Sequence, residues 1–278
     1  MKAVVLGAGT MGRGIALCAV EAGIDTVLVD VSQDVLDAAG RFVRERLDRK
    51  DPAVDAPPRG GWATSTALEE SVLDVDVVIE AVPEVAAIKA ETFARLSGAP
   101  AGALLVTNTS TMSVSEIAGH AARPERVVGM HFFNPAHRMP LVEVIVGDRT
   151  TPAARDEAVA LASRLGKQPV VVRDLPGFVT SRLGLLLGTE AMRMVEEGVA
   201  TAADVDTAMR LGYGHPMGPL ELADLVGLDA RLNNLRSMQA RSGDDRYAPP
   251  QLLVSLVESG HLGRKSGRGF CTYDEAAR

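Results

Sequence analysis

The first half of the chain alternates short apolar runs with longer segments that have the composition of helices. The apolar runs cover residues 2–6, 26–30, 76–81, 104–107 and 127–131. They show no alternation of apolar and polar positions, which is typical of parallel strands covered on both faces. Helical segments lie between them at residues 11–22, 32–49 and 86–96. This order predicts an α/β fold with a Rossmann-like doubly wound parallel sheet.

Two further apolar runs, residues 141–146 and 169–172, extend the same domain. Between them Thr151 and Pro152 predict the start of a helix, because threonine caps helix N-termini and proline suits the first helical position. After residue 174 the pattern changes, and only helices are indicated. They are predicted at residues 182–198, 204–211, 219–226, 230–241 and 250–259, closed by Gly198, Gly212, Gly227, Gly243 and Gly260. We expect domains of residues 1–174 and 175–278, the second all-α.

Composition narrows the classes of function. The net charge of −7 argues against nucleic acid as a partner, because binding phosphates needs a basic face. The longest uncharged stretch, residues 97–115, is rich in Ser, Thr, Asn and Gly, so no membrane span is expected and we predict a cytoplasmic protein. The two cysteines, Cys18 and Cys271, lie far apart and suggest neither a disulfide framework nor a metal site.

A glycine-rich turn follows the first apolar run. Gly7, Gly9 and Gly12 form the G-x-G-x-x-G pattern of a dinucleotide-binding turn, with Thr10 and Met11 between them. The first glycine makes a tight turn, the second lets a pyrophosphate approach the backbone, and the third allows close packing of helix on strand. Asp30 ends the second apolar run, where a carboxylate can bind ribose hydroxyls and repel a 2′-phosphate. These residues predict NAD rather than NADP as the cofactor.

Candidates for chemistry follow the ends of later runs, where ligands bind in doubly wound folds. His131 is a candidate base, because imidazole titrates near working pH; the alternative is a histidine packed between phenylalanine rings. Glu143 lies inside an apolar run and needs either a partner such as His131 or an outward edge position. Ser110 could serve the site or cap the next helix, as Ser113 or Ser115 could.

Glu84 and Lys89 are a second pair of candidates. They are five positions apart at the start of a predicted helix. Taken alone, such a pair is as consistent with solvated surface charges as with a binding role.

Together, seven segments carry a family resemblance. They read GAGTMGRGIA, VIEAVPE, NTSTMSVSEIA, GMHFFNPAHRMPLVEVI, DLPGFVTSRL, HPMGPLELADLVGLD and GRKSGRGF. The chain resembles the NAD-dependent 3-hydroxyacyl-CoA dehydrogenases nearly end to end, including the 3-hydroxybutyryl-CoA enzymes. The resemblance implies oxidation of the 3-hydroxyl of an acyl thioester, and an α-helical second domain that forms a homodimer.

The resemblance also implies roles for single residues. His131 would be the catalytic base, Glu143 would orient it, and Ser110 would contact the substrate oxygen near the nicotinamide. Four further residues would touch the cofactor: Glu84, Lys89, Asn134 and Lys265.

Two departures from the family pattern bear on the substrate. Ser181 stands where the family has an asparagine that bonds the substrate. The segment after the second strand is short and interrupted by Pro52, Pro57, Pro58, Gly60 and Gly61, so it cannot form the family's two-helix arm that holds coenzyme A. Only Arg49, Lys50 and Arg59 remain there as phosphate contacts.

The departures leave the carrier of the acyl group open. Coenzyme A is the first expectation, and an acyl carrier protein of a polyketide extender-unit pathway is the alternative. A third reading is a relative that binds NAD without catalysis, which the intact His131, Glu143 and Ser110 oppose.

Overall fold

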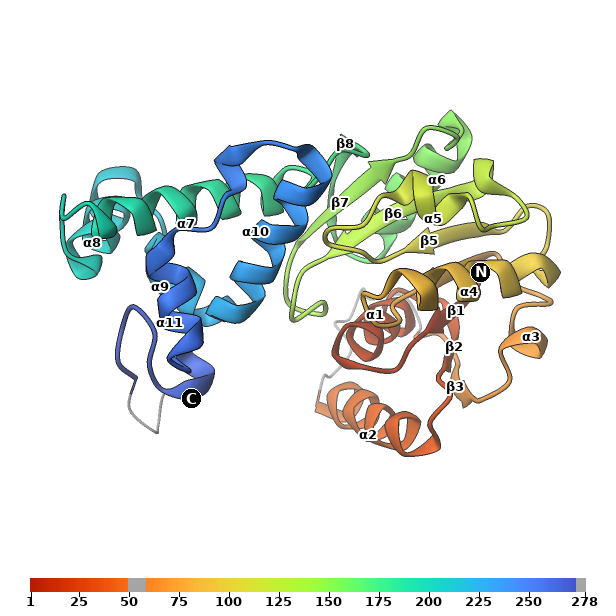
Figure 1. The fold of residues 1–278 in the computed structure, drawn as a ribbon. Coiled ribbons are helices and arrows are strands. Elements are labelled where there is room, and N and C mark those ends of the chain that lie inside the picture. The colour runs from red at the N-terminus through yellow and green to blue at the C-terminus, as the bar shows by residue number, and fades with distance from the viewer. Residues whose placement is uncertain (50–58, 274–278) are drawn as a thin grey trace. The chain divides into compact units, whose positions relative to one another are not determined.

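The computed structural model describes residues 1–49 and 59–273 and divides into two units, the first Met1–Leu175 and the second beginning at Pro176. Strands of the first unit form one sheet of order β3-β2-β1-β4-β5-β6-β7-β8 (Figure 1). Their bounds are β1 Lys2–Leu6, β2 Asp25–Val29, β3 Trp62–Ser65, β4 Val77–Glu80, β5 Leu104–Thr107, β6 Val127–Phe132, β7 Leu141–Val146 and β8 Gln168–Arg173. The Rossmann-like fold is confirmed.

The sheet is not wholly parallel, contrary to the prediction. Strands β1 to β6 pair in parallel, whereas β7 is antiparallel to β6 and β8 runs parallel to β7. The connection from Phe132 to Leu141 contains no helix, and a short connection can join only antiparallel neighbours. Strand β3 was also missed, because its four residues, WATS, are an incompletely buried edge with little apolar signal.

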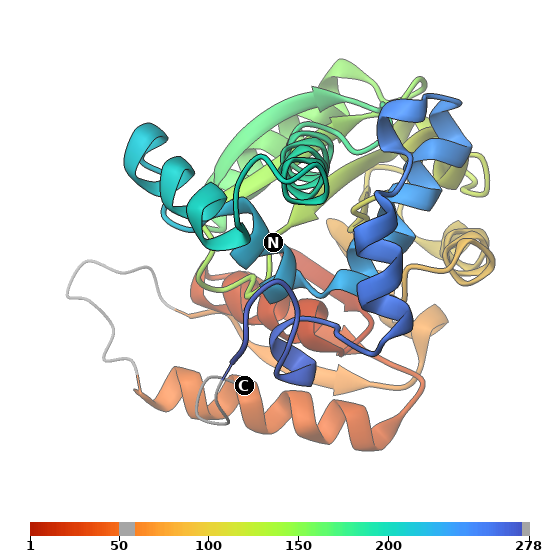
Figure 2. The same ribbon diagram turned by 60° about the vertical axis from the view of Figure 1, so that its left-hand side comes forward.

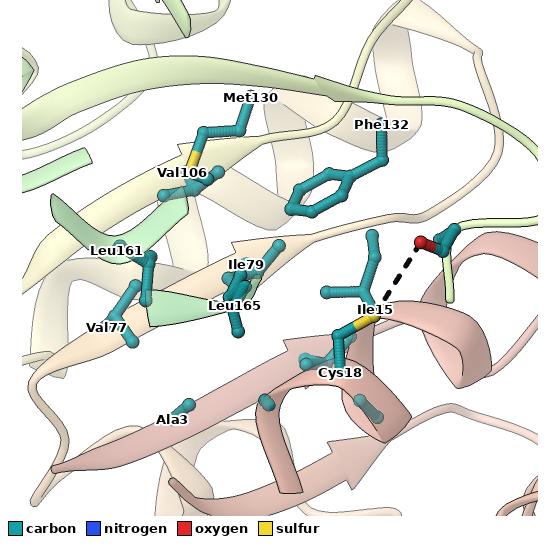
Figure 3. Close-up of a cluster of buried hydrophobic side chains, with 14 of the residues drawn as sticks. Ala3, Ile15, Cys18, Val77, Ile79, Val106, Met130, Phe132, Leu161 and Leu165 are labelled. Carbon is teal, nitrogen blue, oxygen red and sulfur yellow. Dashed lines mark hydrogen bonds between the residues drawn. The ribbon is translucent and has the colours of Figure 1, made fainter. Parts of the chain in front are cut away.

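Helices cover both faces of the sheet. Their bounds are α1 Thr10–Glu21, α2 Gln33–Arg49, α3 Leu68–Ser71, α4 Ala86–Arg95, α5 Val114–Ala118 and α6 Pro152–Arg164, with 3₁₀ turns at Leu96–Gly98 and Pro124–Arg126. Side chains of α1 and α6 pack with those of β1, β4, β5 and β6 in one buried cluster (Figure 3). Thr151 accepts a hydrogen bond from Ala154 N and caps α6, with Pro152 first in the helix, as predicted.

The second unit is helical. Its helices are α7 Thr180–Glu196, α8 Ala202–Tyr213, α9 Pro219–Val226, α10 Leu228–Ser242 and α11 Gln251–Glu258, with 3₁₀ turns at Asp245–Tyr247 and Arg264–Ser266. Helix α7 contacts each of the other four (Figures 1 and 2). Gly212 lies inside α8, so its prediction as a helix end is wrong; Gly214, with φ 71°, ends the helix instead. No helix in the described part of the chain is long and apolar enough to cross a bilayer.

Candidate functional site

The glycine turn between β1 and α1 is built as a dinucleotide cradle. Gly7 has φ 92°, and a Cβ there would lie 2.6 Å from Ala81 O. A Cβ on Gly12 would lie 1.7 Å from Gly7 O, whereas one on Gly9 would meet nothing within 4 Å. Two of the glycines are therefore required by packing, and Gly9 leaves open backbone at the N-terminus of α1, where the helix dipole favours a phosphate. Thr10 is exposed and Met11 partly buried at the same helix start.

Asp30 lies at the end of β2, beside this turn. Its carboxylate accepts hydrogen bonds from Ala8 N at 2.8 Å and Ser32 N at 3.0 Å. It borders a cleft of about 370 Å³ that is also lined by Gly7, Val31 and apolar side chains after β4. The one arginine in this lining, Arg95, is bonded to Glu69. A cleft with apolar walls and a carboxylate at its rim fits the adenosine of NAD.

His131 and Glu143 form a buried pair across β6 and β7. The antiparallel register sets them directly opposite each other, and His131 Nδ1 lies 2.8 Å from Glu143 Oε2. The exposed fractions are 6% for His131 and 1% for Glu143, so the outward edge position considered for Glu143 is excluded. A carboxylate at Nδ1 holds the proton on that nitrogen and leaves Nε2 as the acceptor.

Ser110 completes a line of three groups. Its Oγ lies 3.1 Å from His131 Nε2, and the Phe133 ring lies 4.5 Å from the imidazole, centroid to centroid. Ser113 caps α5 by accepting a hydrogen bond from Glu116 N, so Ser110 is not the cap. The order hydroxyl, imidazole, carboxylate is the arrangement of a positioned general base.

A second buried network lies at the carboxyl ends of β4 and β5. Lys89 is fully buried, and its Nζ lies 2.7 Å from Glu80 Oε1, 3.0 Å from Asn108 O and 3.4 Å from Glu84 Oε2. Lys89 is thus not a solvated surface charge. Burial raises the pKa of Glu80, and the hydrogen-bonded Lys89 and Thr107 oppose that rise. Sequence reasoning missed Glu80, although its place inside an apolar strand is the same signal that identified Glu143.

This network positions the loop that carries Ser110. Glu84 accepts hydrogen bonds from the Thr109 hydroxyl and from Ser110 N, the latter at 2.9 Å. Asn108 Oδ1 accepts one from Phe132 N at 3.1 Å, next to His131. Glu84 and Lys89 therefore act on the site through the backbone of residues 108–110.

The loop after His131 holds Asn134, which is exposed and precedes Pro135 through a cis peptide bond. Ala136 O anchors this loop: it accepts a hydrogen bond from buried Lys167 Nζ at 2.6 Å and a weak one from the Cys18 thiol at 3.7 Å (Figure 3).

Two predicted site residues lie in the second unit. Ser181 is in the first turn of α7 and half-buried. Lys265 Nζ lies 2.5 and 2.6 Å from the carboxylate oxygens of Asp229 and lowers the pKa of that group. Of the shortened arm, Arg49 ends α2, whereas Lys50, Pro52, Pro57 and Pro58 lie outside the described residues.

Comparison with known families agrees with this geometry. The family model "3-hydroxyacyl-CoA dehydrogenase, NAD binding domain" matches residues 2–175, and the model of the C-terminal domain of the same enzymes matches residues 177–273. The chain belongs to the 3-hydroxyacyl-CoA dehydrogenase family. It is thus an NAD-dependent oxidoreductase acting on a CH–OH group.

Similar proteins cover this dehydrogenase nearly end to end. A probable 3-hydroxybutyryl-CoA dehydrogenase of Bacillus subtilis is 41% identical over 98% of this chain and 96% of its own length. The 3-hydroxybutyryl-CoA dehydrogenase of Clostridioides difficile is 37% identical over 99% of this chain and 100% of its own length. The crystal structure of (S)-3-hydroxybutyryl-CoA dehydrogenase from Ralstonia eutropha superposes with a TM-score of 0.92 at 34% identity, covering 99% of both chains.

Proposed function

We propose that the protein transfers hydride between NAD and the 3-hydroxyl or 3-keto group of a short 3-hydroxyacyl thioester, with coenzyme A as the first carrier to test. The observation that supports this most directly is the line Ser110, His131, Glu143, with spacings of 3.1 and 2.8 Å. The family and the names of its similar members agree with it.

His131 Nε2 takes the proton of the 3-hydroxyl as the C–H bond at the same carbon breaks. The Glu143 carboxylate, 2.8 Å from Nδ1, stabilises the imidazolium that results. Ser110 Oγ, within reach of Nε2, donates a hydrogen bond to the substrate oxygen. Bound NAD supplies the hydride acceptor. In the reverse direction the imidazolium returns its proton to the forming alcohol.

The residues that hold the two reactants are also part of this proposal. Asp30 binds the adenosine ribose, and the open backbone at Gly9, with Thr10 and Met11, receives the pyrophosphate. Asn134, Glu84, Lys89 and Lys265 are the further cofactor residues, with Lys89 acting through Glu84 and Asn108. Ser181 is included as the substrate contact that the family resemblance implies.

The partners of the chain complete the proposal. A homodimer through residues 175–278 is supported by large apolar side chains that the second unit leaves exposed. They include Leu183, Val199, Leu211 and Tyr213. An acyl carrier protein remains the alternative carrier, because α2 ends at Arg49 and no second helix precedes β3 in the described residues.

NADH absorbance during incubation with acetoacetyl-CoA tests the function. We expect NADH oxidation by the native protein and a loss of kcat of roughly 10²–10⁴-fold in His131→Gln, the usual worth of a general base. NAD binding should be unchanged, because the glycine turn is intact. His120→Gln, a change at an exposed histidine, is the matched control. Near-native kcat in His131→Gln would exclude this histidine as the base.

A further inference from the structure

Asn108, directly after β5, is held by hydrogen bonds to three neighbouring elements of the first unit. Its backbone N donates to Glu80 O of β4 at 2.8 Å, and its backbone O accepts from Lys89 Nζ of α4 at 3.0 Å. Its side-chain Oδ1 accepts from Phe132 N of β6 at 3.1 Å. Because Phe132 N can only donate, this last contact also fixes which way the amide faces, with Oδ1 toward β6.

The amide nitrogen of Asn108 remains open. Within residues 1–49 and 59–273 no hydrogen bond from Nδ2 occurs, and Nδ2 is not among the buried side-chain atoms of those residues that lack a partner. Asn108 is half-buried, so its two amide N–H groups reach solvent from a residue whose other polar groups are fixed. A donor held in place in this way can bind a ligand acceptor with little further loss of side-chain entropy.

The two ligands of the site differ in what they offer to these donors. In the proposed function the substrate's 3-oxygen already has Ser110 Oγ and His131 Nε2 as partners. The carboxamide oxygen of the nicotinamide is an acceptor to which that proposal assigns no residue. Asn108 also shares its hydrogen-bond network with Lys89, which is a cofactor residue of the same proposal. The cofactor is therefore the ligand that fits a side chain able only to donate.

We propose that Asn108 Nδ2 donates a hydrogen bond to the carboxamide oxygen of the nicotinamide and so sets the orientation of the ring. The inference rests on the proposed function and adds a specific contact to it. It also gives the buried pair of Glu80 and Lys89 a part in the reaction. Lys89 is held by Glu80 at 2.7 Å and in turn fixes the backbone of Asn108, so that the donor keeps its place.

The test measures, by titration calorimetry, the affinity of the full chain for NADH, for its reduced 3-acetylpyridine analogue and for ADP-ribose. The analogue keeps the acceptor oxygen and has a methyl in place of the carboxamide NH₂, whereas ADP-ribose lacks the ring. In Asn108→Asp the side chain still accepts from Phe132 N but has no donor. The analogue should bind this variant about fivefold or more weakly than the native protein, the worth of one neutral hydrogen bond. NADH should lose less, because a turned carboxamide can donate to the new carboxylate, and ADP-ribose should lose nothing.

Asn233→Asp makes the same change at an exposed asparagine of α10 and should bind all three ligands with native affinity. Native affinity of Asn108→Asp for the acetylpyridine analogue overturns the inference. An equal loss of affinity for the analogue and for ADP-ribose also overturns it, because Asn108 would then only brace Phe132 N.

If Asn108→Asp does not fold, the native protein supplies the test. The reduced thionicotinamide analogue, whose sulfur is a weak acceptor, should bind about fivefold more weakly than NADH, and equal affinities overturn the inference. No acyl thioester is present in these titrations, so their outcome does not depend on the proposed substrate. A native protein that oxidises no NADH with acetoacetyl-CoA contradicts the proposed function instead.

Discussion

Replacing Lys89 by methionine isolates the energetics of the buried network at the ends of β4 and β5. Methionine keeps most of the aliphatic volume, so the change removes charge rather than packing. Among the residues that the structure describes, it leaves Glu80, which is fully buried, with the Thr107 hydroxyl at 2.6 Å and Val82 N at 2.8 Å as its remaining partners. Removing one partner of a buried ion pair costs about 3–5 kcal/mol, which is a large share of the 5–15 kcal/mol that typically stabilises a folded protein.

The assay is urea unfolding followed by circular dichroism, with a second variant that removes the orphaned charge. In Glu80→Gln/Lys89→Met the amide oxygen can still accept from Val82 N, and the amide nitrogen can donate to the Thr107 hydroxyl, which then accepts. We therefore expect the double variant to regain about 2 kcal/mol over Lys89→Met. Lys2→Met, at an exposed lysine bonded to Asp74, is the matched control and should unfold at the native urea concentration. If the double variant is no more stable than Lys89→Met, the buried charge of Glu80 is not the cause of the stability lost in the single variant.

The pH dependence gives an independent check. Burial already raises the pKa of Glu80 above the ordinary value of 4.5 in the native protein, and loss of Lys89 raises it further. Between 4.5 and that raised pKa, the folded state holds a proton that the unfolded state has lost, so stability falls as pH rises. The stability lost in Lys89→Met should therefore shrink as the pH is lowered from about 8 toward about 5. A loss independent of pH would contradict this account.

Three further changes test the cofactor and substrate sites. Gly12→Ala must displace Gly7 O, because its Cβ would lie 1.7 Å away; titration calorimetry should show NAD binding weaker by about tenfold or more. Asp30→Ser with Val31→Arg should shift the ratio of kcat/KM toward NADP, and an unchanged ratio would remove Asp30 from the ribose role. Ser181→Asn should raise kcat/KM for 3-hydroxybutyryl-CoA by roughly fivefold, the worth of a neutral hydrogen bond of about 1 kcal/mol. An unchanged kcat/KM would mean that serine in place of the family's asparagine has no effect on this substrate.

Much of the first unit could be predicted because its signals are local. Each of these signals depends on a few adjacent residues: a glycine pattern after an apolar run, a carboxylate at the end of the next run, and a Thr-Pro pair that starts a helix. The direction of β7 could not be predicted, because apolar periodicity indicates a strand and not its partner. Strand β3 was not predicted, because an edge strand need not be apolar.

The missed polar residues share one physical reason. The place of Glu80 inside an apolar strand indicates that it needs a partner, but that this partner is Lys89, from another element, depends on how the chain folds. Arg231, on α10, is 8% exposed although it lies among other arginines of that helix, and its burial depends on the packing of α10 against α7. Whether a charge faces solvent or the interior is a tertiary property, and spacing along the chain indicates it only weakly.

The reversed strand β7 makes the His131–Glu143 pair possible. In an antiparallel ladder, residues directly opposite lie on the same face, and a slip of one residue would turn Glu143 to the other face. Gly129 lies two positions before His131, on the same face of the sheet as the pair, and it supports this register because no larger residue fits there. A Cβ on Gly129 would lie 2.7 Å from Val114 Cγ2 and 2.8 Å from Ile145 Cβ. Ile145 packs over Gly129 as Glu143 packs over His131. The glycine therefore lets β6, β7 and α5 approach closely enough to hold the base and its carboxylate at 2.8 Å.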